Sequence, residues 1–104
     1  MPRFMYVFHG GKAPETPEEG EQVMAAWGAW FAELGAAVLE PGGPAGDSHT
    51  VSASGVVGDG GANPVSGLTI VQAADHDAAC EMAKGCPMVV SGNGSVEVAE
   101  ILAM

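Results

Sequence analysis

The last third of the chain constrains the fold most strongly, because it contains a complete strand–helix–strand pattern. The β-branched run Leu68–Val71 predicts a strand over Leu68–Gln72, and Asp75 is a good N-cap for a short alanine-rich helix. That helix is expected to stop at Lys84–Gly85, with Pro87 just beyond. A glycine-rich link and a last strand over Ser95–Ile101 follow. A strand, helix, link and strand within about forty residues is half of a ferredoxin-like α+β unit.

The first half of the chain repeats the strand-to-helix pattern. A strand is predicted over Arg3–His9. Thr16–Glu19 supplies an N-cap, an N-terminal proline and a capping-box glutamate for a helix that ends at Gly35. Its apolar residues recur at helical spacing, at Val23, Trp27, Trp30, Phe31 and Leu34. Gly28, inside this helix, is interpreted as a point of close contact with the sheet.

The middle of the chain predicts two further strands separated by loops. Ala36–Glu40 and Thr50–Val57 are the predicted second and third strands, and the loops are Pro41–Gly46 and Gly58–Pro64. The predicted order is β-α-β-β-β-α-β, in a single domain over residues 1–104. We expect an antiparallel sheet with both helices on one face.

Both faces of the first predicted strand are apolar, which indicates that both are covered. Alternation along the strand divides the side chains into two sets: Phe4, Tyr6 and Phe8, and Met5, Val7 and His9. A sheet with one face in water would alternate apolar with polar residues. Two helices can cover only one face, so we expect a second copy of the chain, in a homodimer, to cover the other.

Charge and composition exclude several classes of partner. The chain has 3 basic and 13 acidic residues, a net charge of −10, so binding to nucleic acid or to an anionic membrane is not expected. It has no apolar run long enough to span a membrane and no signal-peptide pattern at its start. Cys80 and Cys86 are expected to be free thiols, since their spacing does not suit a disulfide. A cytoplasmic location is therefore expected.

Four residues are candidates for catalysis. His9 ends the first strand before two glycines, where a general acid or base could lie; the alternative is a histidine hydrogen-bonded at the sheet edge. Glu97 shares a side of the last strand with Ala99, and either faces the dimer cavity or faces water. Asp47 and His49 flank Ser48 in a loop; these three form a site only if the fold makes them converge, and otherwise cap the loop.

Other residues are candidates for holding a ligand. Trp27 and Trp30 are either core anchors or the wall of a pocket. Ser48, Asp59 and Asn63 lie in loops, and the glycine pattern around Asp59 favours a turn over a nucleotide-binding loop. No spacing of histidines and cysteines matches a metal site, and nothing indicates a cofactor.

Several stretches of the chain resemble the YCII-related (DGPF-domain) family. They are Phe4–Gly10, Met24–Trp30, Ala83–Pro87 and Gly94–Val98. The resemblance runs over nearly the whole chain and implies a ferredoxin-like fold of the dimeric α/β-barrel superfamily, in which two sheets pack by the faces that the helices leave bare. The Asp-Gly-Pro-Phe signature would fall at Asp59–Gly60, where Gly61–Ala62 replace its Pro-Phe.

These features lead to three functional hypotheses. The first is a small acid/base enzyme, with His9 as general acid or base and Asp47 or Glu97 as orienting carboxylate, in a pocket at the sheet–dimer face. The second is a non-catalytic dimer that binds a small ligand or regulates a partner. The third is an accessory interaction protein without a pocket. The sequence ranks the first two nearly equal.

Overall fold

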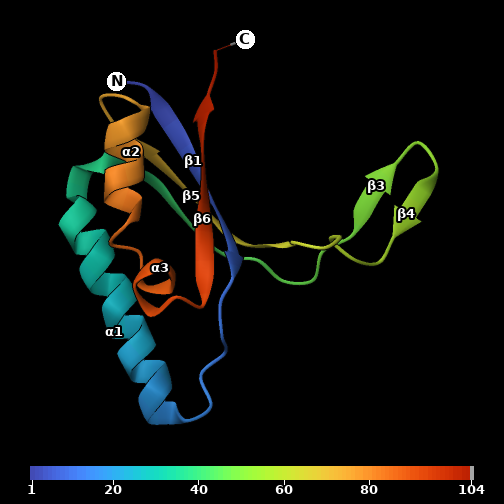
Figure 1. Ribbon diagram of the computed structural model, residues 1–104, viewed down its shortest axis with the longest axis horizontal. Helices are drawn as coiled ribbons and strands as arrows, with labels where there is room; N and C mark the ends of the chain where they lie inside the picture. The colour runs from blue at the N-terminus through green and yellow to red at the C-terminus, as the bar shows by residue number, and fades with distance from the viewer. Residues whose placement is uncertain (104) are drawn as a thin grey trace.

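A four-stranded antiparallel sheet forms the centre of the molecule, and the helices lie on one of its faces (Figure 1). The computed structural model describes residues 1–103. The strands are β1 Arg3–Gly10, β2 Val38–Pro44, β5 Val65–Gln72 and β6 Gly94–Ile101, in the order β2-β5-β1-β6. Strand β5 lies between β2 and β1, which are joined through a helix. This is the ferredoxin-like arrangement predicted from the sequence.

Helices α1 and α2 begin at the capping residues that the sequence predicted. Helix α1 covers Pro17–Leu34, and the Thr16 Oγ1 atom accepts a hydrogen bond of 3.1 Å from the Glu19 amide. A short 3₁₀ helix, η1, follows at Gly35–Ala37. Helix α2 covers His76–Ala83, with the Asp75 carboxylate accepting a 2.8 Å hydrogen bond at its start. The interpretation of Gly28 is wrong, because a Cβ atom there would meet nothing within 4 Å.

Two segments differ from the expected secondary structure. The predicted strand Thr50–Val57 is a hairpin, with β3 at Thr50–Ser52 and β4 at Gly55–Val57. The expected link after α2 contains a third helix, α3, at Pro87–Ser91. Proline suits the first turn of a helix, where its missing N–H has no partner to lose, so Pro87 begins a helix as well as ending the previous segment.

The edge strand β2 is longer than predicted and runs into the expected loop Pro41–Gly46. Gly42 makes this path possible, because it has a φ of +61° and a Cβ atom there would overlap the Leu68 carbonyl. Its pairing with β5 is irregular, with register shifts on both sides of Glu40.

The hydrophobic core lies between the sheet and the helices. It contains Phe4, Tyr6 and Phe8 of β1. The Tyr6 hydroxyl donates a 2.5 Å hydrogen bond to the Ala79 carbonyl, and its ring stacks on Trp30 with centroids 6.0 Å apart. The Trp30 indole N–H donates to the Met82 carbonyl at 3.0 Å. These contacts tie β1, α1 and α2 together.

The opposite face of the sheet, called here the open face, carries apolar side chains but no described helix (Figure 1). Met5 pairs with Ile70 on one side and Ala99 on the other, and Val7 pairs with Leu68 and Glu97. Directly opposed residues point to the same side of a sheet, so these side chains form one surface. Leu68 is 41% exposed.

The hairpin β3–β4 projects from the body of the molecule (Figure 1). We call residues 50–57 the arm. Its two strands pair only with each other among the described strands. The molecule measures 43 × 43 × 20 Å and has a radius of gyration of 14.8 Å, against about 13 Å for a compact domain of this length.

No helix within residues 1–103 combines the length and the apolar character needed to cross a membrane.

Candidate functional site

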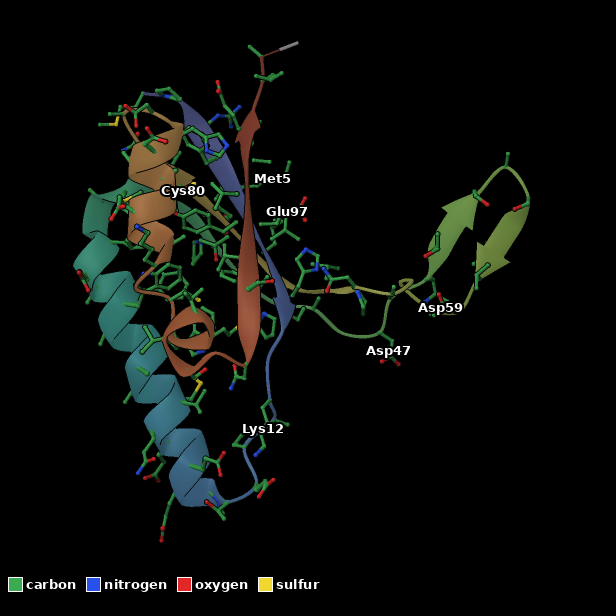
Figure 2. All side chains as sticks on the ribbon, in the orientation of Figure 1. Met5, Lys12, Asp47, Asp59, Cys80 and Glu97 are labelled. Carbon is green, nitrogen blue, oxygen red and sulfur yellow. The ribbon has the colours of Figure 1, made fainter. Side chains whose placement is uncertain are left out.

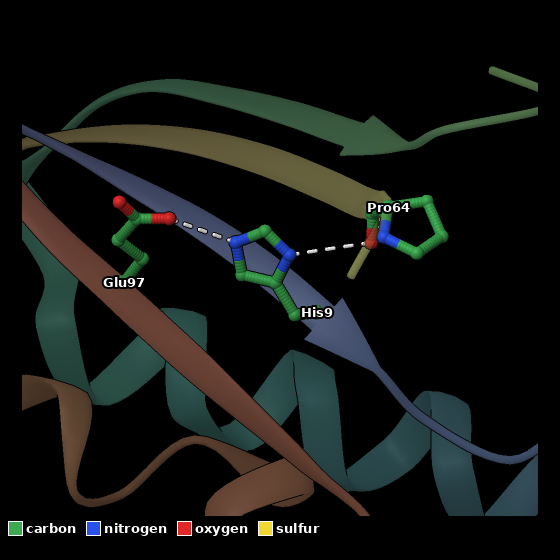
Figure 3. Close-up of polar contacts among 3 residues, drawn as sticks. All are labelled: His9, Pro64 and Glu97. Atoms are coloured by element: carbon green, nitrogen blue, oxygen red, sulfur yellow. Dashed lines mark hydrogen bonds and ion pairs between the residues drawn. The ribbon is translucent and has the colours of Figure 1, made fainter. Parts of the chain in front are cut away.

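His9 sits at the end of β1 on the open face, and both of its ring nitrogens are engaged (Figure 3). The Nε2 atom lies 2.9 Å from the Glu97 Oε1 atom, and the Nδ1 atom lies 3.2 Å from the Pro64 carbonyl oxygen. A carbonyl oxygen only accepts hydrogen bonds, so Nδ1 carries a hydrogen. The imidazole is therefore held in one orientation, with Nε2 directed at a carboxylate.

The register of the sheet explains why these groups meet. Glu97 pairs with Val7, one diagonal step from His9 on the same face. On the other side the register shifts, because Phe8 faces Gly67 while His9 faces Val65. Ser66 is the extra residue of this bulge. The bulge lies next to Pro64, whose carbonyl reaches the imidazole.

The surroundings of His9 favour its charged form. The hydrogen bond to Glu97 raises the pKa of His9, and the backbone carbonyls of Pro64 and Asn63 raise it further, against a lowering by burial. When both nitrogens donate, the ring is an imidazolium and forms an ion pair with the carboxylate.

The two partners differ in how far they reach solvent. The His9 side chain is 11% exposed and the Glu97 side chain is 66% exposed. A solute approaching the open face therefore meets the carboxylate first, with the imidazole behind it. Figure 2 shows Met5 and Glu97 on the side of the sheet away from the helices.

A second group of predicted residues converges at the base of the arm. Asp47, Ser48 and His49 lie on the segment that leads into the arm, and Asp59 lies on the segment that returns. They line a shallow open hollow of about 360 Å³, which Pro64 also borders. Figure 2 shows Asp47 and Asp59 on these two segments. The hollow is thus adjacent to the residue whose carbonyl orients His9.

The returning segment accounts for the departure from the DGPF signature. Gly61 has a φ of +84°, and its amide donates a 2.9 Å hydrogen bond to the Asp59 carboxylate. Proline is confined to a φ near −65° and has no N–H, so it could not take this position. Gly60 is packed so closely that a Cβ atom would lie 2.8 Å from the Ser48 Cβ atom.

The remaining predicted residues lie elsewhere. Trp30 is 3% exposed in the core, and Trp27 packs edge-on against Phe8, with ring centroids 5.3 Å apart. Both tryptophans are on the helix side of the sheet, opposite His9. Asn63 directly precedes Pro64 and contributes its backbone carbonyl to the surroundings of His9. Within residues 1–103, no three His, Cys, Asp or Glu side chains are grouped so that they could hold a metal ion.

Two features of the site have no signal in the sequence. The Pro64 carbonyl is a backbone group, and only the bulge brings it to His9. The Ser66 hydroxyl, in that bulge, is buried without a hydrogen-bond partner among the described residues. The length of the segment before β5 indicates neither the contact of the Pro64 carbonyl nor the burial of the Ser66 hydroxyl.

The fold and the paired residues define a ferredoxin-like α+β protein with a candidate acid–base site on the open face of its sheet. The chain belongs to the YCII-related domain family, whose model matches residues 4–104. The resemblance found in the sequence is thereby confirmed.

A solved structure supports the fold. The chain is similar to 5-chloro-2-hydroxyhydroquinone dehydrochlorinase (TftG) from Burkholderia phenoliruptrix AC1100, in complex with 2,5-dihydroxybenzoquinone, with a TM-score of 0.60 and 17% identity. The match covers 100% of this chain and 96% of that one. It confirms the predicted fold, a ferredoxin-like antiparallel sheet with its helices on one face. No curated protein sequence gave a significant match.

Proposed function

We propose that the protein processes a small molecule by acid–base chemistry at the His9–Glu97 pair, as a homodimer. One observation carries this proposal: an imidazole held 2.9 Å from a carboxylate, on a sheet face that no described helix covers. Asp47, the alternative partner for His9, lies at the hollow instead. The two free cysteines are in keeping with a reducing compartment such as the cytoplasm.

The geometry supports a defined path for the proton. The Pro64 carbonyl keeps a hydrogen on Nδ1, so Nε2 is the ring atom that exchanges a proton. When His9 is neutral, the exposed Glu97 carboxylate takes the proton of a bound molecule and passes it to Nε2, which leaves an imidazolium beside a carboxylate. Glu97 can also turn toward water and leave Nε2 free to face the ligand.

The surroundings of the His9–Glu97 pair favour a ligand whose ring is apolar on its faces and polar at its edge. Met5, Val7 and Leu68 supply apolar surface on the same face. The similar structure is named as a dehydrochlorinase of a hydroxylated ring, and loss of hydrogen chloride requires a group that takes a proton as chloride leaves. A small hydroxylated ring is therefore the substrate class that we propose.

The alternative is a non-catalytic dimer that binds a small ligand or regulates a partner. The observation in its favour is that neither ring nitrogen of His9 is free. A general base needs a free nitrogen or a free carboxylate oxygen within reach of the substrate. In this alternative the ion pair serves only to recognise a charged or hydroxylated ligand.

Two probes separate these functions. Binding of 2,5-dihydroxybenzoquinone is followed by NMR, and chloride release from 5-chloro-2-hydroxyhydroquinone is followed with a chloride electrode. The variants are His9→Ala and Glu97→Gln, with His76→Ala as the matched control because this exposed histidine lies on α2. We expect His9→Ala and Glu97→Gln to lower chloride release by about 100-fold or more, and the control to leave it unchanged.

The outcomes of these measurements distinguish the enzyme from the binding dimer. Release that depends on His9 supports the enzyme. Saturable binding that depends on His9 without release supports the binding dimer. Binding or release that persists in both His9→Ala and Glu97→Gln would contradict a site at this pair.

A further inference from the structure

We propose that the arm of one copy packs onto the open face of a second copy and closes the His9–Glu97 site of that second copy. The exchange is reciprocal, so each copy gives an arm and receives one. This inference rests on the two-copy assembly of the proposed function, and it adds the partner's arm to the site.

The exposed area of the chain matches what a dimer needs. The chain exposes 6761 Å². A folded monomer of 10.4 kDa exposes about 5,400 Å². The excess of about 1,400 Å² exceeds the roughly 800 Å² that each partner contributes to a stable interface. The chain therefore has surface of the right extent for a partner of its own size.

The arm is one source of this excess. Its valines are strongly exposed, at 75% for Val51, 66% for Val56 and 53% for Val57. An isolated two-stranded hairpin is marginally stable in water, and it gains stability by packing against another element. The described part of this chain offers the arm no third strand.

The open face is the other source, and its chemistry matches that of the arm. Residues 50–57 contain no charged side chain, although the chain as a whole carries 13 acidic residues and a net charge of −10. The open face pairs Met5 with Ile70 and Ala99. Its charged groups are of both signs: Glu97 lies beside His9, and pairing places Glu40 and Arg3 on the same face. Two acidic chains repel each other, so surfaces without net charge are favoured for close contact.

These two surfaces identify a second copy as the partner. Each chain has one apolar arm and one apolar face, so a two-fold pair of copies covers all four surfaces at once. An unrelated protein that covered the face would leave the arm in water. The arm leads away from the sheet of its own chain, so it does not cover its own site (Figure 1).

The position of the arm connects the interface with the site. The arm's returning segment ends at Pro64, whose carbonyl holds the Nδ1 atom of His9. The site is open by itself, with the Glu97 side chain 66% exposed and the neighbouring hollow shallow. Covering Glu97 with the partner's arm would exclude water from the ion pair, which strengthens its electrostatic interactions.

The first experiment measures the assembly of arm variants by sedimentation equilibrium. Val51→Asp combined with Val56→Asp places two carboxylates on the arm, and Met24→Asp places one on an equally exposed apolar residue of α1, which is 74% exposed. We expect the double variant to raise the dimer dissociation constant by about 100-fold or more, and Met24→Asp to leave it unchanged. Far-UV circular dichroism verifies folding. A monomeric parent protein, or a double variant that dimerises normally, would overturn the proposal.

The second experiment identifies where the arm lies. A photo-crosslinking benzoyl-phenylalanine replaces Val56, and ¹⁵N-labelled and unlabelled proteins are mixed before irradiation. We expect crosslinks between a heavy and a light chain, on peptides that contain β1 or β6. Crosslinks confined to one chain, or to α1 of the second chain, contradict the proposal. Heavy–light crosslinks in a protein that shows neither chloride release nor ligand binding would retain the arm exchange and reject the proposed function.

Discussion

At the scale of the residue, the His9–Glu97 pair is defined by what surrounds its two ring nitrogens. A carboxylate and a carbonyl both accept hydrogen bonds, so the fully bonded ring must be charged. The hydrogen bond to Glu97 is the largest cause of the raised pKa of His9. A group whose pKa is raised by folding stabilises the folded state most below its ordinary pKa, and loses that contribution as the pH rises through the folded value.

Glu97→Gln should therefore destabilise the protein in a pH-dependent way. We expect the parent protein to be more stable than Glu97→Gln at about pH 6, below the ordinary pKa of histidine, and the difference to shrink toward about pH 9 as the imidazole loses its proton. Urea unfolding at the two pH values measures the difference. Glu100→Gln is the matched control on the same strand, since Glu100 pairs with Phe4. A difference that grows with pH would show that the ion pair is not its cause.

At the scale of the element, β1 connects the two halves of the fold. Its buried face contacts α1 through Trp30 and α2 through Ala79, and its other face carries His9. The Tyr6 hydroxyl connects β1 to α2 by a hydrogen bond within the core. Burial, followed by the nearby Cys80 and Cys86, raises the pKa of Tyr6 to about 12, so the hydroxyl remains a donor across the ordinary pH range.

Tyr6→Phe tests this connection. The change keeps the ring and removes the donor to Ala79, so we expect the free energy of unfolding to fall by about 1 kcal/mol. Ser91→Ala is the control, since the exposed Ser91 hydroxyl lies on α3 and bonds only to the Met88 carbonyl among the described residues. The control should change stability by less than about 0.5 kcal/mol. Equal losses in the two variants, measured by urea unfolding, would count against the connection.

The sequence predicted the elements whose signals are local. Thr16 and Asp75 marked helix starts, and alternation along β1 separated the core face from the open face. The hairpin was missed because alternation continues through Val51, Ala53 and Val57 across the turn. Helix α3 was missed because Pro87 was interpreted only as a stop signal.

The site was partly predictable for the same reason. Side chains alternate along a strand with a period of two residues, which made His9 and Glu97 candidates on their strands. His9 was already assigned to the face of the sheet that is left for the dimer. Their contact depends on the register of β1 with β6, which no local pattern specifies. The Pro64 carbonyl and the Ser66 bulge depend on tertiary structure alone.

At the scale of the whole molecule, one buried thiol reports on global unfolding. Cys86 is 0% exposed, between α2 and α3, and burial raises the pKa of its thiol. Cys80 is intermediate in exposure. The folded protein must open its core before a reagent reaches Cys86.

In a Cys80→Ser variant, the remaining thiol should react with Ellman's reagent at about pH 8 at least roughly 1,000-fold more slowly than free cysteine. The rate should rise with urea in parallel with unfolding followed by tryptophan fluorescence. The Cys86→Ser variant, which retains Cys80, should react faster. Rapid modification of Cys86 without urea would indicate local opening around α3, in place of a protected core.

The edges of the sheet set a limit on how this protein can associate. Strand β2 forms one edge, and Pro41 and Pro44 have no N–H to offer while Gly42 bends its backbone. A strand from another chain could not form a regular ladder of backbone hydrogen bonds with β2. Strand β6 forms the other edge, so at most one edge of each sheet is open to pairing. Through edge pairing, a central sheet with one usable edge can join one other central sheet but cannot extend further. The prolines of β2 thus limit pairing between central sheets at this edge.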